Sequence, residues 1–123
     1  WQFEGTMPRQ PTVQTDEKQL AIKTGIVKRL VKEVAHYKKE TQEHADRVAK
    51  MKADGKDVYD IKKAEEVLEE TRLMIPDSTR RLSEALDDLE TLLDVVGENP
   101  QVQTSETFPI AKDFLASRET LVA

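Results

Sequence analysis

Apolar residues recur with helical spacing along two long segments of the chain. The first segment runs from Asp16 to about Asp54 without a proline. In a sevenfold series its a positions are Leu20, Val27, Val34, Thr41 and Val48, and its d positions are Lys23, Leu30, Tyr37, His44 and Met51. Ile26 and Val31 widen this apolar stripe in the first half only, and a wide stripe can contact two neighbours. The pattern predicts one long helix that packs against two helices near its start and against one farther on.

The second segment begins near Asp57 or Asp60, either of which can cap a helix. Its a positions are Ile61, Leu68, Ile75, Leu82, Leu89 and Val96, and its d positions are Ala64, Thr71, Ser78, Ala85 and Leu92. The series stays in phase across Pro76, which favours a single helix kinked at that proline. In the alternative, Pro76 opens a separate helix with Asp77 in its first turn. Because Gly55 tolerates the left-handed conformation that ends helices, the two segments predict an antiparallel hairpin.

A shorter third helix is predicted after residues 97–100, which form a stop signal followed by a polar loop. It starts at about Ser105, with Ser105 or Thr107 as its cap and Pro109 in its first turn. About half as long as the others, it is expected to fold back over the wide halves of the hairpin. The predicted fold class is therefore all-α, an elongated, coiled-coil-like antiparallel three-helix bundle with the second helix kinked at Pro76 and a short third helix.

One domain is expected, over residues 16–123. Residues 1–6 precede Met7 and lack the pattern of a signal peptide, so we interpret them as a cloning scar, and residues 7–15 as a disordered lead-in. The chain of 123 residues is 35% charged, contains no Cys and has a formal net charge of −5. Disulfides and thiolate chemistry are thus excluded, and general nucleic-acid binding is disfavoured. No apolar run is long enough to predict a membrane span.

The sequence offers little that resembles an active site. His36, Glu40 and His44 stand four residues apart on a helix, but the two histidines are about 12 Å apart along its axis, too far to share one zinc ion. Carboxylate pairs such as Glu65 and Glu66 fit an exposed helix face. No phosphate-binding loop or hydrolase motif occurs. We therefore expect no enzyme activity, no metal and no other cofactor.

Charge is unevenly distributed along the chain. Residues 18–39 carry a net charge of +6, and residues 84–98 carry −6 with no basic residue. These segments are neighbours in the predicted hairpin, so they could simply attract each other along the helix flanks. Alternatively, the outward residues Lys28, Arg29, Lys32 and Lys39 form a basic strip that is offered to an acidic partner. Both interpretations can hold in part.

Leu73 is an apolar residue that does not fit the core pattern. It occupies an outward position beside Met74, directly before Ile75 and Pro76. A lone exposed leucine is ordinary protein surface. Next to the predicted kink, and flanked by Arg72 and other charged side chains, it is equally consistent with a contact site for another protein.

Several stretches of the sequence resemble the tubulin-binding cofactor A family. They are KTGIVKRLVKE at residues 23–33, YDIKK at 59–63, ETRLMIPD at 70–77 and RRL at 80–82. The resemblance covers residues 20–89 in order and at the spacing of the family. It implies a small three-helix protein without enzymatic activity, nucleotide or metal.

The same resemblance implies a cytoplasmic, cytoskeleton-associated protein that binds β-tubulin after its release from the cytosolic chaperonin. Such a protein holds the subunit and passes it to other folding cofactors during αβ-tubulin assembly. The binding face implied for this chain comprises the outward residues of the matching stretches, which are Lys28, Arg29, Lys32, Tyr59, Lys62, Lys63, Arg72, Leu73, Asp77, Arg80 and Arg81. In an alternative interpretation, the chain is a structural coiled-coil module that forms a homodimer or docks on another helix. Monomer and homodimer both stay open.

Overall fold

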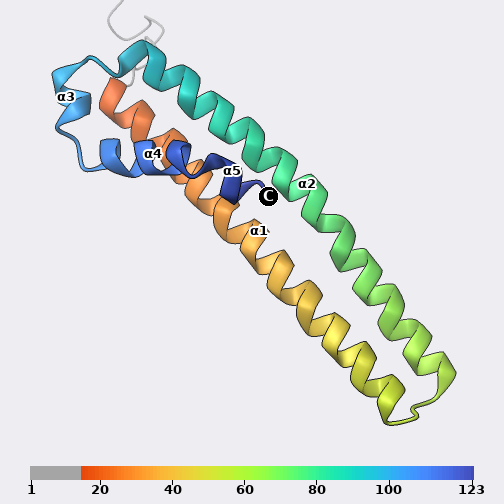
Figure 1. Ribbon diagram of the computed structural model, residues 1–123. Coiled ribbons are helices and arrows are strands. Elements are labelled where there is room, and N and C mark those ends of the chain that lie inside the picture. The colour runs from red at the N-terminus through yellow and green to blue at the C-terminus, as the bar shows by residue number, and fades with distance from the viewer. Residues whose placement is uncertain (1–14) are drawn as a thin grey trace, which may run out of the picture.

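Two long antiparallel helices form a rod, and three short helices fold back along one half of it (Figure 1). The computed structural model describes residues 15–123, so the predictions for residues 1–14 lie outside the described residues. The helices are α1 (Asp16–Ala53), α2 (Val58–Val96), α3 (Pro100–Gln103), α4 (Thr107–Ala116) and α5 (Arg118–Leu121). The predicted all-α class is confirmed.

Local sequence signals fix the ends of α1 and the start of α2. Thr15 is part of the N-terminal cap of α1 rather than a disordered lead-in, since its Oγ1 accepts a hydrogen bond from the backbone N–H of Lys18 at 3.2 Å. Gly55 adopts the predicted left-handed conformation with φ of 67°. Asp57 is the N-cap of α2, without a side-chain hydrogen bond.

The second helix runs through Pro76 without interruption, so the alternative of two separate helices is wrong. Proline has no N–H for the carbonyl of Arg72, one turn earlier, and an interior proline costs about 3 kcal/mol. Apolar side chains in phase on both sides of Pro76 supply packing that offsets this cost. The bend at Pro76 stays a prediction.

The C-terminal part differs from the single third helix that the sequence predicts. Residues 100–103, expected as loop, form α3, and Ser117 separates α4 from α5. Asn99 explains α3, because its Oδ1 caps the N–H of Gln101 at 3.0 Å while its Nδ2 donates to Asp16 Oδ2 at 3.0 Å. This side chain therefore ties the start of α3 to the start of α1.

The hydrophobic core occupies only the half of the rod that the short helices cover. Its fully buried residues come from the first half of α1, the second half of α2, and α3 and α4; the largest are Leu20, Val27, Leu82, Leu86, Leu89 and Val102. In the uncovered half, between residues 36 and 75, Val48 is the one buried residue among those described. The half with the short helices therefore carries the core, and the rest of the rod is a two-helix arm.

Candidate protein-binding faces

The basic strip on α1 is exposed and unpaired. We use this name for Lys28, Arg29, Lys32 and Lys39, whose side chains all lie on the surface. None of them forms an ion pair with a side chain of residues 15–123. These cations lie within about three turns of one helix, so their charges add to a local positive potential.

The expected attraction between the basic and acidic segments accounts for little of this charge. Lys23 Nζ lies 4.0 Å from Asp88 Oδ2, but the acidic end of α2 is engaged mainly by Arg118 of α5. Arg118 contacts Asp87, lies 3.9 Å from Glu90, and also donates to the backbone carbonyl of Ser83 at 3.2 Å. The C-terminal segment therefore competes with α1 for these carboxylates and leaves the basic strip available.

The outward face of α2 mixes apolar and charged side chains. Tyr59 and Leu73 are each 63% exposed, and Lys63 Nζ lies 5.5 Å from the centre of the Tyr59 ring, within cation–π distance. Lys62 and Arg72 are also exposed. Leu73 therefore has the outward position predicted from the sequence. Such a mixture of aromatic, aliphatic and basic groups is typical of protein contact surfaces.

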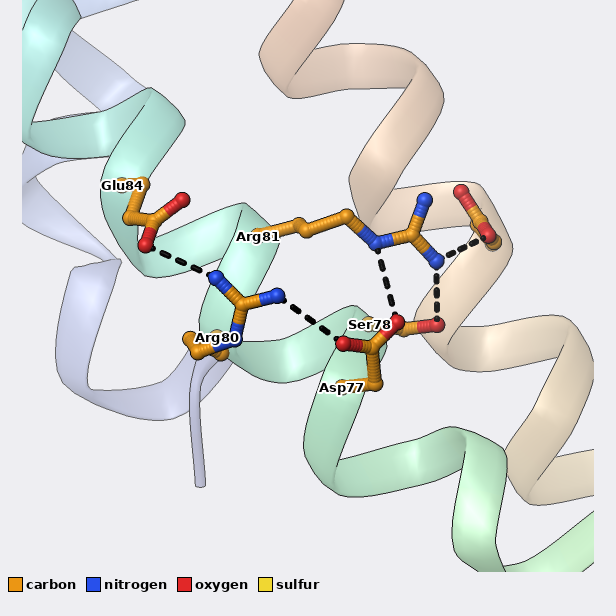
Figure 2. A network of polar contacts seen from close by, with 6 residues as sticks. Asp77, Ser78, Arg80, Arg81 and Glu84 are labelled. Carbon is orange, nitrogen blue, oxygen red and sulfur yellow. Dashed lines mark hydrogen bonds and ion pairs between the residues drawn. The ribbon is translucent and has the colours of Figure 1, made fainter.

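A row of ion pairs follows Leu73 on the same helix (Figure 2). Arg80 donates from Nη2 to Asp77 Oδ1 and from Nη1 to Glu84 Oε1, both at 2.9 Å. The hydrogen bond from Arg80 lowers the pKa of Asp77 below its usual value of 3.8, and the charge of Arg81 acts in the same direction. The carboxylates of Asp77 and Glu84 raise the pKa of Arg80, which stays charged. The row therefore orders exposed side chains on the outward face of α2.

Arg81 does not lie on the outward face, which corrects its place in the predicted binding site. Its half-buried guanidinium turns toward α1, where Nη2 donates to Glu33 Oε1 at 3.0 Å. The same nitrogen lies 3.4 Å from Ser78 Oγ, and Nε lies 3.3 Å from Asp77 Oδ2 (Figure 2). Arg81 is thus a brace between the two long helices.

The position of Arg81 could have been recognised from the heptad pattern. Glu33 and Arg81 both precede an a position, and these flanking positions face each other across helix pairs. Across the described residues, three ion pairs join α1 to α2 and fix their alignment. They are Lys23 with Asp88, Glu33 with Arg81, and Lys52 with Glu65.

The predicted binding residues consequently fall into two groups rather than one patch. The alignment of α1 and α2 places Lys28, Arg29 and Lys32 beside the acidic end of α2, in the half that carries the core. Tyr59, Lys62, Lys63, Arg72 and Leu73 lie on the two-helix arm. Asp77 and Arg80 lie at the junction. A single partner that touches both groups must therefore extend along the rod.

His36 and His44 of α1 both lie close to the carboxylate of Glu40. His36 Nε2 lies 3.2 Å from Glu40 Oε2, and His44 Nε2 lies 3.7 Å from Glu40 Oε1. Among residues 15–123, no group of three His, Cys, Asp or Glu side chains is arranged to hold a metal ion. Within the same residues, no helix is both long and apolar enough to cross a membrane.

These features define an elongated helical protein whose surface offers exposed faces for another macromolecule. The family model "Tubulin binding cofactor A" matches residues 15–115. The chain belongs to the tubulin-binding cofactor A family.

Similar proteins span much of the chain. The tubulin-specific chaperone A of Homo sapiens is 49% identical over 77 residues, which are 63% of this chain and 71% of that protein. The protein of the same name from Gallus gallus is 43% identical over 100 residues, 81% of this chain and 90% of that protein. The crystal structure of tubulin folding cofactor A from Arabidopsis thaliana matches with a TM-score of 0.77 and 40% identity, covering 85% of this chain and 96% of that one.

Proposed function

We propose that this protein is a tubulin-folding chaperone that binds β-tubulin after its release from the cytosolic chaperonin. It holds the subunit during assembly of the αβ-tubulin dimer and meets other tubulin-folding cofactors indirectly. Membership of the tubulin-binding cofactor A family supports the tubulin partner. The observation that carries the proposal in the structure is the basic strip, whose exposed and unpaired cations can attract an acidic protein surface.

The proposed action is binding without catalysis, in the cytoplasm and close to the cytoskeleton. It uses no nucleotide, metal, nucleic acid or membrane. The pockets of the described residues are open grooves on a narrow rod, whereas small-molecule sites enclose most of the ligand surface. An extended surface of this kind suits a protein partner.

The residues proposed to contact β-tubulin are those of the two exposed groups. They are Lys28, Arg29 and Lys32 on α1, and Tyr59, Lys62, Lys63, Arg72, Leu73, Asp77 and Arg80 on α2. Arg81 supports this surface from behind, because it joins α2 to Glu33 of α1.

Co-elution tests the proposal directly. Purified protein is mixed with β-tubulin freshly released from the chaperonin and separated by gel filtration. We expect a complex that contains β-tubulin and this protein, and no complex with α-tubulin as the matched control. Absence of a β-tubulin complex, or equal binding of both tubulins, would contradict the proposal.

A homodimeric coiled-coil module is the second candidate, and the exposed apolar residues of the arm favour it. On α2 these are Val58, Tyr59, Val67, Leu73 and Met74. A second copy could cover them through a symmetric contact. Light scattering over a wide concentration range distinguishes the two cases. A monomer at every concentration excludes an obligate homodimer, whereas a dimer without affinity for β-tubulin favours this candidate over the chaperone.

A further inference from the structure

An open groove lies between α1 and α2 close to the Gly55 turn, where no short helix covers the rod (Figure 1). We call it the hairpin groove. Its volume is about 520 Å³, and Met51, Ala64 and Val67 give it an apolar floor. Ala64 occupies an inward d position, and its small side chain leaves room that a leucine would fill. The groove thus results from the sparse packing of the two-helix arm.

The exposure of the lining indicates the kind of occupant. Met51 and Ala64 are half-buried and Val67 is 44% exposed, and no lining residue is fully buried. A small molecule needs walls that cover most of its surface, which this groove lacks. A protein segment can instead place one apolar side chain on the floor and run along the rims.

The rims of the groove carry more positive than negative charge. Arg47, Lys56 and Lys63 line it, with Asp60 as the one carboxylate of the lining. Arg47 and Lys56 form no ion pair with residues 15–123, and Lys63 lies 3.7 Å from Glu66. Arg47 of α1 and Lys56 of the turn between the long helices therefore line an open groove without an ion-pair partner among residues 15–123. An occupant with carboxylates would neutralise them.

His44 completes the lining and does not change this balance. Its Nε2 lies 3.7 Å from Glu40 Oε1, a carboxylate outside the groove. His44 therefore brings no carboxylate into the lining of the groove.

We propose that the hairpin groove docks an extended acidic segment of a protein partner. An apolar side chain of that segment contacts Met51, Ala64 and Val67, and its carboxylates pair with Arg47, Lys56 and Lys63. Lys63 is also one of the proposed β-tubulin contacts, but the other lining residues are not, and the inference requires only the charge and shape of the groove. Lys28, Arg29 and Lys32 of the basic strip lie in the other half of the rod, so these two surfaces can be tested separately.

A synthetic peptide tests the groove on the full chain without tubulin. The probe is a fluorescein-labelled heptapeptide with a central phenylalanine and three glutamates on each side, followed by fluorescence anisotropy at low salt. We expect saturable binding that weakens about tenfold in Arg47→Glu/Lys63→Glu, because each reversal replaces an attraction by a repulsion. Ala64→Leu should weaken binding to a similar extent by filling the floor without a change of charge.

The matched control is Lys62→Glu, which changes the same charge one residue away, outside the groove lining. It should alter the peptide affinity less than twofold. Circular dichroism of each variant checks that it folds. Ala64→Leu changes the volume of the groove and the charge-reversal variant changes its charge, so misfolding of one leaves the other as a test. Loss of affinity in Lys62→Glu equal to that in Arg47→Glu/Lys63→Glu, unchanged binding in Ala64→Leu, or no binding by the unmodified protein would overturn the proposal. None of these results bears on β-tubulin binding, because the assay contains no tubulin.

Discussion

Arg80 and Arg81 are adjacent in the sequence, yet their guanidinium groups have different surroundings. Arg80 lies on the outward face of α2 and pairs with Asp77 and Glu84, one turn away on either side. Arg81 turns inward to Glu33 of α1. An exposed pair within one helix contributes little to stability, whereas a half-buried pair between helices also fixes their alignment. The outward group orders a contact face, and the inward group aligns the helices.

The pKa of Asp77 depends on the hydrogen bond that Asp77 accepts from Arg80. The hydrogen bond from Arg80 holds this pKa below 3.8, so the contact stabilises the folded state fully above pH 3.8. That contribution is lost as the pH falls through the lower folded-state pKa. We expect an NMR titration of the side-chain carboxyl carbon to give a pKa below 3.8, and a value closer to 3.8 in Arg80→Ala.

Arg72→Ala is the matched control for this titration. Arg72 pairs with Glu69 at 3.0 Å and forms no ion pair with Asp77, so the pKa of Asp77 should not change in this variant. An Asp77 pKa at or above 3.8 in the unmodified protein would contradict the arrangement in Figure 2.

At the scale of the element, α2 keeps an unfavourable residue in its interior. Pro76 is exposed, and the helix continues on both sides of it because Ile75 and Ser78 pack inward against α1. The tertiary packing of a long amphipathic face can exceed the local cost of one lost hydrogen bond. Pro76 therefore weakens a helix that its packing maintains.

Replacing this proline should stabilise the fold. Pro76→Ala provides an N–H for the carbonyl of Arg72 and removes the ring, which stabilises the folded helix by up to about 3 kcal/mol. The unfolded chain gains conformational freedom without the proline, and this lowers the net stabilisation by about 1 kcal/mol. We expect the free energy of unfolding in urea to rise by about 1–2 kcal/mol. Glu70→Ala, another exposed position on α2, should change it by less than about 0.5 kcal/mol. A loss of stability in Pro76→Ala would show that the packing of α2 requires the geometry imposed by the proline.

The long helices could be predicted from the sequence because their signals repeat. The series through Leu20 and Leu82 recurs every seven residues, and Gly55 marks the turn between the helices. The C-terminal part lacks such repetition. There, Asn99 caps a four-residue helix through one side chain, and a turn at Ser117 divides the expected third helix. Short elements of this kind depend on single contacts that periodicity does not reveal.

The same limit applies to the candidate site. Exposure of Lys28, Tyr59 and Leu73 follows from their positions outside the apolar stripe, and the structure confirms it. The heptad pattern marks Arg81 as a flanking position, but its pairing with Glu33 and the hairpin groove depend on which side chains meet between the helices. To predict such contacts, the relative alignment of α1 and α2 must be known, and the heptad series of each helix does not give it.

At the scale of the whole molecule, the buried core and the exposed apolar residues of the arm lie in different halves of one rod. The short helices bury the core on one half and engage the acidic end of α2 through Arg118. The other half has little core and exposes the arm of α2 that carries Leu73. Lys38 Nζ donates to the Ala123 carbonyl at 2.7 Å, so one cation of α1 holds the end of the described chain. Lys28, Arg29 and Lys32 of the basic strip lie on the half that carries the core and form no ion pair with residues 15–123.

This arrangement predicts that the strip sets the rate and affinity of partner binding without contributing to the fold. Lys28→Glu/Lys32→Glu should weaken the β-tubulin complex about tenfold, mainly through slower association, and should reduce its dependence on salt. Helical circular dichroism and thermal stability should stay unchanged, because both side chains are exposed and unpaired. The control Lys18→Glu/Lys50→Glu makes the same change of charge at the two ends of α1, outside the strip, and should weaken the complex less than threefold. Equal affinities of the two double variants would show that only the total charge of the protein matters, and that the strip is not a contact surface.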